Sequence, residues 1–315
     1  MDSFEEKLKS LLEAADIENV EFTQWAFTDN DQKDFHVMSV SEFCSEFVKI
    51  MVAFKTHNFI SKKQSSFTSQ LKKNLPDYNA LILMDFAENY SIKTQNEVQN
   101  AYFRKKQISI LTIYVYMQVG DQLKEQSYVA LTDDVRHAKT ATVYTSYRKL
   151  QAILDDKFPQ RVFSYILSDG CAGQFKNRKQ FTTISYHEAD FGHKCAWIFS
   201  ASGHGKSVVD GIGGTVKRLA SEESIRSQFD HSITSAKGFH DFMIRKNLKT
   251  IPFIVTTEEI DNVESELNQR FSNAIQVKGT QKFHHFTTCP TNSNYLLVKP
   301  FSESKNTSRV KINKK

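Results

Sequence analysis

The sequence predicts a mixed α/β protein built around one central sheet. Two short apolar runs, residues 81–84 and 162–167, each lead into an aspartate, Asp85 and Asp169. Continuous apolar runs bounded by polar residues are typical of strands buried on both faces. A third segment, residues 107–117, is rich in β-branched and aromatic residues and is the strongest strand signal in the chain.

Composition predicts a globular chain. It has 315 residues, of which 40% are hydrophobic, and only 5 Pro and 11 Gly, which argues against low complexity. The net charge of +5 suits a nucleic-acid partner and an ordinary surface equally well. Four cysteines without a CxxC pair indicate a reducing, intracellular location. The acidic N-terminus does not resemble a signal peptide, and no apolar stretch reaches about 18 residues, so we expect no membrane partner.

Residues 1–75 are expected to be mainly helical. Phe4, Leu8 and Leu11 recur at helical spacing in residues 3–16, and a second helical pattern covers residues 41–73.

Residues 76–225 contain the strongest alternation of strands and helices. The expected strands are 80–86, 107–117, 126–131, 162–167 and 195–200, with a hairpin turn at Gly120 and Asp121 and helices at 138–158, 176–188 and 206–225. Residues 226–301 are expected to form an α+β extension. The basic tail, residues 302–315, is expected to be disordered.

Three strands followed by alternating helices and strands is the element order of the ribonuclease-H-like fold. That fold is a five-stranded mixed sheet with helices on both faces, in which the first and fourth strands are neighbours. Asp85 and Asp169 would then be adjacent in space, although they are 169 − 85 = 84 positions apart in the sequence.

Two aspartates on adjacent strands can bridge two divalent ions for phosphodiester chemistry. Hard oxygen ligands favour Mg²⁺ or Mn²⁺. The third carboxylate is assigned to Asp210 at the start of a helix, because Glu222 and Glu223 lie about 18–20 Å further along it. Taken singly, each aspartate is equally explained as a turn or helix-start residue. The interpretation as a catalytic metal site depends on the three together.

Glycine-rich stretches at 203–205 and 211–214 flank Asp210 and would let the backbone approach a phosphate. They do not match a P-loop, so no nucleotide cofactor is expected. Cationic side chains near the three aspartates are candidates for binding DNA, and the alternative for them is an ordinary polar helix start. These candidates are Lys176, Arg178, His204, Lys206, Lys217 and Arg218.

Several blocks of sequence resemble a known family. The blocks are MDFAENY, TDDVRH, SDGCAGQFKNR and SGHGKSVVDGIGGTVKRLA, and together they span about residues 75–225. They resemble animal DDE/D-type transposase-derived proteins. The resemblance implies a ribonuclease-H-like core, two Mg²⁺ ions, DNA strand cleavage and strand transfer, and acidic roles for Asp85, Asp169 and Asp210. It also implies transposon ends or target DNA as the partner, a nuclear location and a homo-oligomer.

The sequence departs from that family at its N-terminus. Such transposases often carry a zinc-dependent DNA-binding module, yet the first 75 residues contain only Cys44 and too few histidines for one. One alternative is therefore a catalytically inactive, domesticated remnant that binds DNA or protein. Another is a ribonuclease-H-like nuclease that acts on RNA or hybrids.

Overall fold

The computed structural model describes residues 2–26, 32–93, 106–136, 139–201, 208–226 and 233–314. They form two compact units, Met1–Lys62 and Lys63–Lys315. None of the described helices is long and apolar enough to cross a bilayer. The second unit contains all three aspartates of the predicted site.

The first unit combines two helices with a β-hairpin. Helix α1 covers Asp2–Glu13, strands β1 (Asn19–Ala26) and β2 (Gln32–Ser39) pair antiparallel, and helix α2 (Val40–Lys73) begins here. Ser39 and Glu42 form reciprocal side-chain-to-backbone hydrogen bonds at the start of α2. Residues 1–75 are mainly helical, as expected, and the hairpin is an element that the sequence analysis did not predict, although side chains such as Phe22, which stacks on His36, alternate with strand periodicity.

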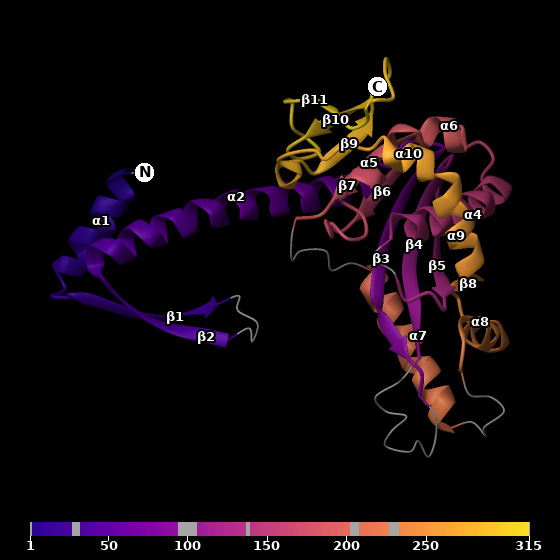
Figure 1. Cartoon of the computed structure of the whole chain (residues 1–315), viewed down its shortest axis with the longest axis horizontal. Coiled ribbons are helices and arrows are strands. Elements are labelled where there is room, and N and C mark those ends of the chain that lie inside the picture. The colour runs from indigo at the N-terminus through magenta and orange to yellow at the C-terminus, as the bar shows by residue number, and fades with distance from the viewer. Residues whose placement is uncertain are drawn as a thin grey trace. The chain divides into compact units, whose positions relative to one another are not determined.

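The second unit is organised on a nine-stranded sheet in the order β11-β10-β9-β7-β6-β3-β4-β5-β8 (Figure 1). The strands are β3 Asn79–Ser91, β4 Gln107–Val119, β5 Gln122–Thr132, β6 Phe163–Ser168, β7 Lys194–Phe199, β8 Ile251–Ile254, β9 His285–Thr288, β10 Tyr295–Lys299 and β11 Ser308–Lys311. Strands β3, β4 and β5 are antiparallel neighbours, whereas β3, β6 and β7 run parallel. The mixed α/β class is confirmed, and the five central strands have the order and directions expected of a ribonuclease-H-like sheet.

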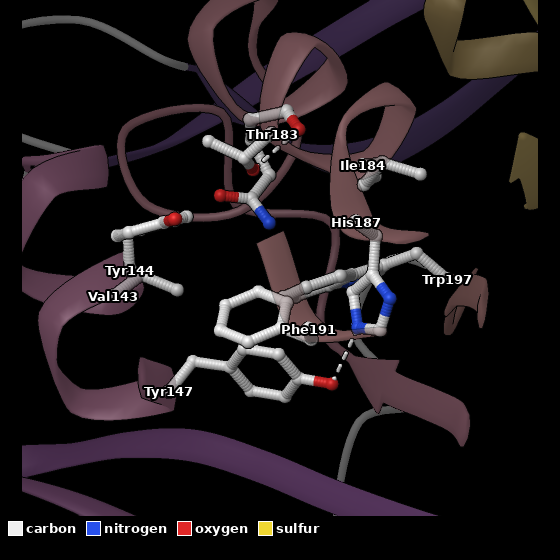
Figure 2. Close-up of a pocket in the computed structure, with 9 residues that line it drawn as sticks. Val143, Tyr144, Tyr147, Thr183, Ile184, His187, Phe191 and Trp197 are labelled. Carbon is white, nitrogen blue, oxygen red and sulfur yellow. Dashed lines mark hydrogen bonds between the residues drawn. The ribbon is translucent and has the colours of Figure 1, made fainter. Parts of the chain in front are cut away.

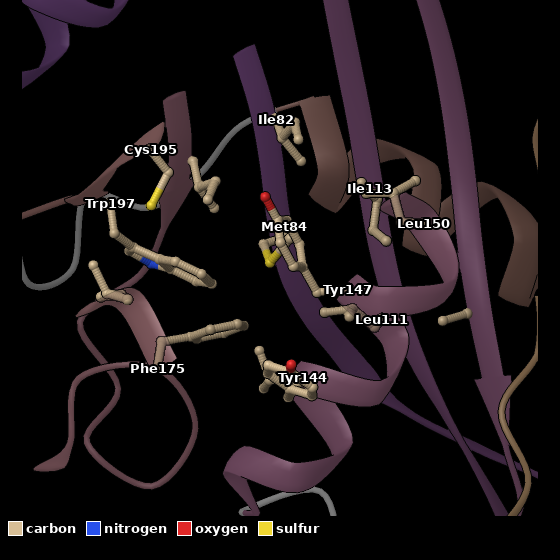
Figure 3. Close-up of a cluster of buried hydrophobic side chains, with 14 of the residues drawn as sticks. Ile82, Met84, Leu111, Ile113, Tyr144, Tyr147, Leu150, Phe175, Cys195 and Trp197 are labelled. Atoms are coloured by element: carbon tan, nitrogen blue, oxygen red, sulfur yellow. The ribbon is translucent and has the colours of Figure 1, made fainter. Parts of the chain in front are cut away.

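Helices cover both faces of this sheet. They are α4 Thr140–Lys157, α5 Arg178–Ser185, α6 His187–Phe191, α7 Val208–Arg226, α8 Ala236–Arg245, α9 Thr257–Glu266 and α10 Asn268–Ser272. On one face, side chains of α4 such as Tyr147 and Leu150 pack with Met84 of β3 and Trp197 of β7 (Figure 3). On the other face, α7 and α8 pack on alternate residues of β4 and β5. Because successive side chains of the central strands are buried on opposite faces, their sequences are continuous apolar runs.

The C-terminal residues extend the same sheet rather than forming a separate layer. Strand β8 pairs with β5 at one edge, and β9, β10 and β11 continue from β7 at the other. The expectation of a disordered tail is wrong, because β11 pairs with β10 and Ile312 is buried. The edge of β10 offers unpaired backbone groups, and pairing with them outweighs the polar composition of the tail.

Candidate active site

Asp85 and Asp169 lie at equivalent register positions of two adjacent parallel strands, Asp85 within β3 and Asp169 directly after the end of β6. Each paired residue of β3 faces a β6 residue 84 positions later, as in Leu83 and Leu167 (167 − 83 = 84). The two aspartates have the same offset, 169 − 85 = 84, and follow two positions beyond that pair. Because side chains alternate along strands, Asp85 occupies the sheet face used by Leu83, and the charge of Asp169 acts on it there. The predicted adjacency of the two strands is thereby confirmed.

Helix α7 brings Asp210 to the same face. Val209 is buried in a cluster with Leu81 and Leu83 of β3. One turn after Asp210, Gly213 lies against the sheet: a Cβ atom there would be 2.8 Å from Ala87 Cβ and 3.3 Å from Thr112 Cγ2. Thr112 is the β4 partner of Asp85 and donates a hydrogen bond to the Asp85 carbonyl oxygen (2.9 Å). The start of α7 is thus fixed beside Asp85 by a contact that only a glycine permits.

The pKa of Asp85 shows that the other two carboxylates are close to it. Burial raises the pKa of Asp85, and the negative charges of Asp169 and Asp210 raise it further, to about 7. Burial also raises the pKa of Asp169, although the Cys171 N–H donates to Asp169 Oδ1 (3.1 Å) and acts in the opposite direction. Repulsion from the two neighbouring carboxylates therefore acts mainly on Asp85.

The three carboxylates fit a divalent cation by chemistry but do not form a closed ligand set. Their oxygens are the donors that Mg²⁺ and Mn²⁺ prefer, and a cation would relieve the repulsion that raises the pKa of Asp85. Within the described ranges, however, no three His, Cys, Asp or Glu side chains are close enough together to hold a metal ion. Asp85 and Asp169 supply the fixed part of the candidate centre, and Asp210 is exposed on α7.

The segment after Asp169 is ordered by its own backbone. The Cys171 carbonyl oxygen accepts hydrogen bonds from the N–H groups of Gln174, Phe175 and Lys176, at 2.8–3.2 Å. Asn177 then begins α5, and its side chain accepts from the N–H groups of Lys179 and Gln180. These contacts hold the segment against the end of β6 without a regular element.

Lys176 does not lie where its predicted contact with DNA requires. It is only 5% exposed, its side chain passes Gly170, and its Nζ lies 5.2 Å from the centre of the Phe199 ring. Burial lowers the pKa of its ammonium group to about 8. The hydrophilic sequence around Lys176 gave no sign of this burial, which results from packing of the segment between β6 and β7.

The remaining cationic candidates differ in their surroundings. Arg178 is exposed at the start of α5. Lys217 donates to the Glu88 carbonyl oxygen (3.1 Å) and pairs with the Glu88 carboxylate (3.5 Å). Arg218 pairs with Glu222 along α7 (2.6 Å). His204 and Lys206 lie outside the described residues. Of the four that the structure describes, Arg178 and Arg218 are exposed, whereas Lys176 is buried and Lys217 is partly buried.

A small cavity lies between α4, α5 and α6, away from the aspartates (Figure 2). It measures about 10 Å³, which is room for about one water molecule. Tyr147 and His187 hydrogen-bond across it (2.8 Å), and burial lowers the pKa of His187 to about 3. His187 Nδ1 bonds the His193 carbonyl oxygen, so Nδ1 carries the proton and Nε2 accepts from Tyr147. With room for about one water molecule, this cavity is too small for a substrate.

The molecule is therefore a mixed α/β protein with an acidic site where the pairing of two parallel central strands, β3 and β6, ends. Residues 64–302 match a family described as a domain of unknown function (DUF8701), and the chain belongs to that family. No curated protein is significantly similar in sequence.

Two solved structures show distant similarity. They are described as the crystal structures of NurA with manganese and of NurA, and each is 11% identical to this chain. The alignments cover 82% and 83% of this chain, with TM-scores of 0.18 and 0.17. The chain spans about half the length of these structures, 50% in each case. Scores this low carry no argument about fold or function.

Proposed function

We propose that this protein is a transposase-like enzyme that cleaves and transfers DNA strands with the help of two divalent metal ions. The observation that supports this most is the level placement of Asp85 and Asp169, with Asp210 near enough to raise the pKa of Asp85. The resemblance of the sequence blocks around these aspartates to DDE/D transposase-derived proteins supports the same proposal. Its expected partners are transposon ends and target DNA, and its expected location is the nucleus.

In this proposal, the aspartates bind metal ions and an exposed arginine binds DNA. Asp85 and Asp169 would hold Mg²⁺ or Mn²⁺ between their strand ends, and Asp210 would complete the binding of the second ion. Bound metal ions would activate the attacking oxygen and stabilise the leaving oxygen of a phosphodiester. Arg178, exposed at the start of α5, would attract the DNA backbone. A homo-oligomer is expected from the resemblance alone.

A direct test is Mg²⁺-dependent nicking of labelled duplex DNA by the wild type and by Asp85→Asn. We expect the substitution to reduce the rate by more than about 100-fold, because even groups that only orient metal ligands contribute roughly 10–100-fold. DNA binding should persist or tighten, since one negative charge is lost. Asp121→Asn, in the exposed β4–β5 turn, is the matched control and should cleave like wild type. Equal nicking by all three proteins would refute the proposal.

A catalytically inactive remnant that binds DNA or protein is the alternative, and one observation favours it. The three carboxylates do not converge into a ligand set within the described ranges. Such a remnant would bind DNA without any metal-dependent cleavage. Cleavage assays on DNA, RNA and hybrid substrates, run in parallel, would distinguish the transposase-like enzyme and the inactive remnant from a nuclease that acts on RNA or hybrids.

A further inference from the structure

A polar pocket adjoins the acidic site along the unpaired edge of β3. Strand β3 pairs with β6 only as far as Leu83, yet it continues to Ser91. Along this extension lies a cavity of about 360 Å³, which is within the range of about 300–1,000 Å³ of small-molecule sites. Its lining comprises Phe86, Ala87, Glu88, Asn89, Ser91, Gln107 and Gln174.

The pocket is built from the same two elements that carry the central aspartates. Phe86 immediately follows Asp85, and Gln174 lies in the ordered segment after Asp169. The register between β3 and β4 shifts between Ala87 and Tyr90, which places Glu88 and Asn89 in a bulge. Bulges next to functional sites commonly redirect side chains. A ligand held at the aspartates would therefore extend naturally into this cavity.

Carboxamides dominate the chemistry of the lining. Asn89 Nδ2 donates to Gln107 Oε1 (3.1 Å), and Gln107 Nε2 donates to Ser91 Oγ (3.4 Å), so these groups hold one another in place. The Gln174 side chain makes no hydrogen bond to any residue that the structure describes. A carboxamide carries both a donor and an acceptor, which is the pattern needed to bind the edge of a nucleobase.

The remaining lining residues favour an uncharged, flat ligand. Among the residues that the structure describes, the lining includes no Lys or Arg to bind a phosphate, and its one charged group, Glu88, pairs with Lys217. The half-buried Phe86 ring, whose centre lies 5.8 Å from that of Phe175, provides an aromatic wall. Unpaired bases are commonly bound by stacking on aromatic rings together with hydrogen bonds to their edges.

We infer that this pocket binds an unpaired nucleobase next to the phosphate that a divalent cation at Asp85 and Asp169 would hold. The inference rests on the proposed function only for the source of the base, a nucleic-acid strand at the acidic site. Gln174 contacts the edge of the base, and Asn89 and Gln107 form the fixed polar wall opposite. The base is thereby separated from its neighbours in the strand, which exposes the adjacent phosphate to the aspartates.

The test uses the full chain and needs no catalysis. Deoxynucleoside 5′-monophosphates and deoxyribose 5-phosphate are titrated in Mg²⁺, and binding is followed by saturation-transfer NMR. We expect the base protons to receive the strongest saturation and the nucleotides to bind more tightly than the sugar phosphate. Gln174→Ala should weaken nucleotide binding about three- to tenfold, as expected for the loss of one hydrogen bond. Gln269→Ala, an exposed glutamine on α10, is the matched control.

The outcomes separate this inference from the proposed function. Equal binding of nucleotides and deoxyribose 5-phosphate, or unchanged binding by Gln174→Ala, would overturn the base pocket even if the protein nicks DNA. Base-dependent binding by a protein that never nicks DNA would support the pocket and count against the nuclease. If the true ligand of this pocket is a peptide that pairs with the β3 edge, the base protons should receive no saturation in the nucleotide titration. That result would also overturn the inference.

Discussion

Asp85 of β3 and Asp169, directly after β6, each follow by two positions the paired residues Leu83 and Leu167. Asp85 shares its sheet face with the start of α7, where Asp210 lies. The cost of this arrangement is a partly buried carboxyl, Asp85, whose pKa is raised to about 7. Five measurements follow from this geometry and from the packing around it.

Asp85→Asn should stabilise the metal-free protein at neutral pH. The folded-state pKa of Asp85, about 7, is above its ordinary value of 3.8, so the folded protein binds more protons than the unfolded chain between these values. The contribution of Asp85 to stability therefore falls as pH rises from about 4 to about 7. In EDTA, we expect the melting temperature of Asp85→Asn to exceed that of wild type by at least about 2–4 °C at pH 7.5. The advantage should shrink towards pH 4, and a constant difference would contradict it.

Divalent metal should reverse that ranking. A cation that binds only the folded state raises its stability in proportion to the logarithm of its concentration. Millimolar Mn²⁺ or Mg²⁺ should raise the melting temperature of the wild type, and the shift should be lost in Asp85→Asn and in Asp169→Asn. Asp121→Asn should respond like wild type. A melting temperature independent of metal would favour the inactive remnant.

Gly213→Ala should displace Asp210 without unfolding the protein. The added Cβ would lie 2.8 Å from Ala87 Cβ, so α7 must shift away from β3, and overpacking of this kind costs about 1–3 kcal/mol. We expect both the metal-induced shift in melting temperature and nicking to fall. Gly214→Ala is the matched control, because nothing lies within 4 Å of its Cβ. It should be stabilising by about 0.5–1 kcal/mol through helix propensity.

A second substitution can separate the position of α7 from general damage. Ala87→Gly removes the atom that the Gly213→Ala methyl group would meet. The double variant should therefore recover metal binding and nicking relative to Gly213→Ala alone, measured as a double-mutant cycle. Strictly additive losses would show that the close approach of Gly213 does not position Asp210.

Buried histidines should make the fold sensitive to acid. Burial lowers the pKa of His187 to about 3 and the pKa values of His193, His284 and His285 to about 4. The unfolded chain protonates these groups near 6.5, so the free energy of unfolding should fall as pH drops from about 6.5 towards 4. Urea unfolding of Asp85→Asn is the appropriate measurement, because Asp85 has the opposite pH dependence. An unfolding free energy that stays flat between pH 6.5 and 4.5 would contradict the prediction.

The sequence was sufficient for the central sheet because its strands are buried on both faces. Residues 107–117 and the apolar runs before Asp85 and Asp169 had no competing periodicity, and all three are strands. Helical spacing likewise identified α1, α2, α4 and α7. The hairpin of β1 and β2 and the strand β11 were missed, because their strands are rich in polar residues and largely exposed.

Local sequence alone determined which residues could provide chemistry: strand-end aspartates, a helix-start aspartate and a polar segment after Asp169. Tertiary structure decided which of them act together. The 84-residue offset becomes a contact only through the register of β3 with β6, and the place of Asp210 depends on Gly213 against Ala87 and Thr112. It also buried Lys176 and left the edge of β3 beyond Leu83 unpaired. Register and burial are products of packing between distant segments, and no local pattern encodes them.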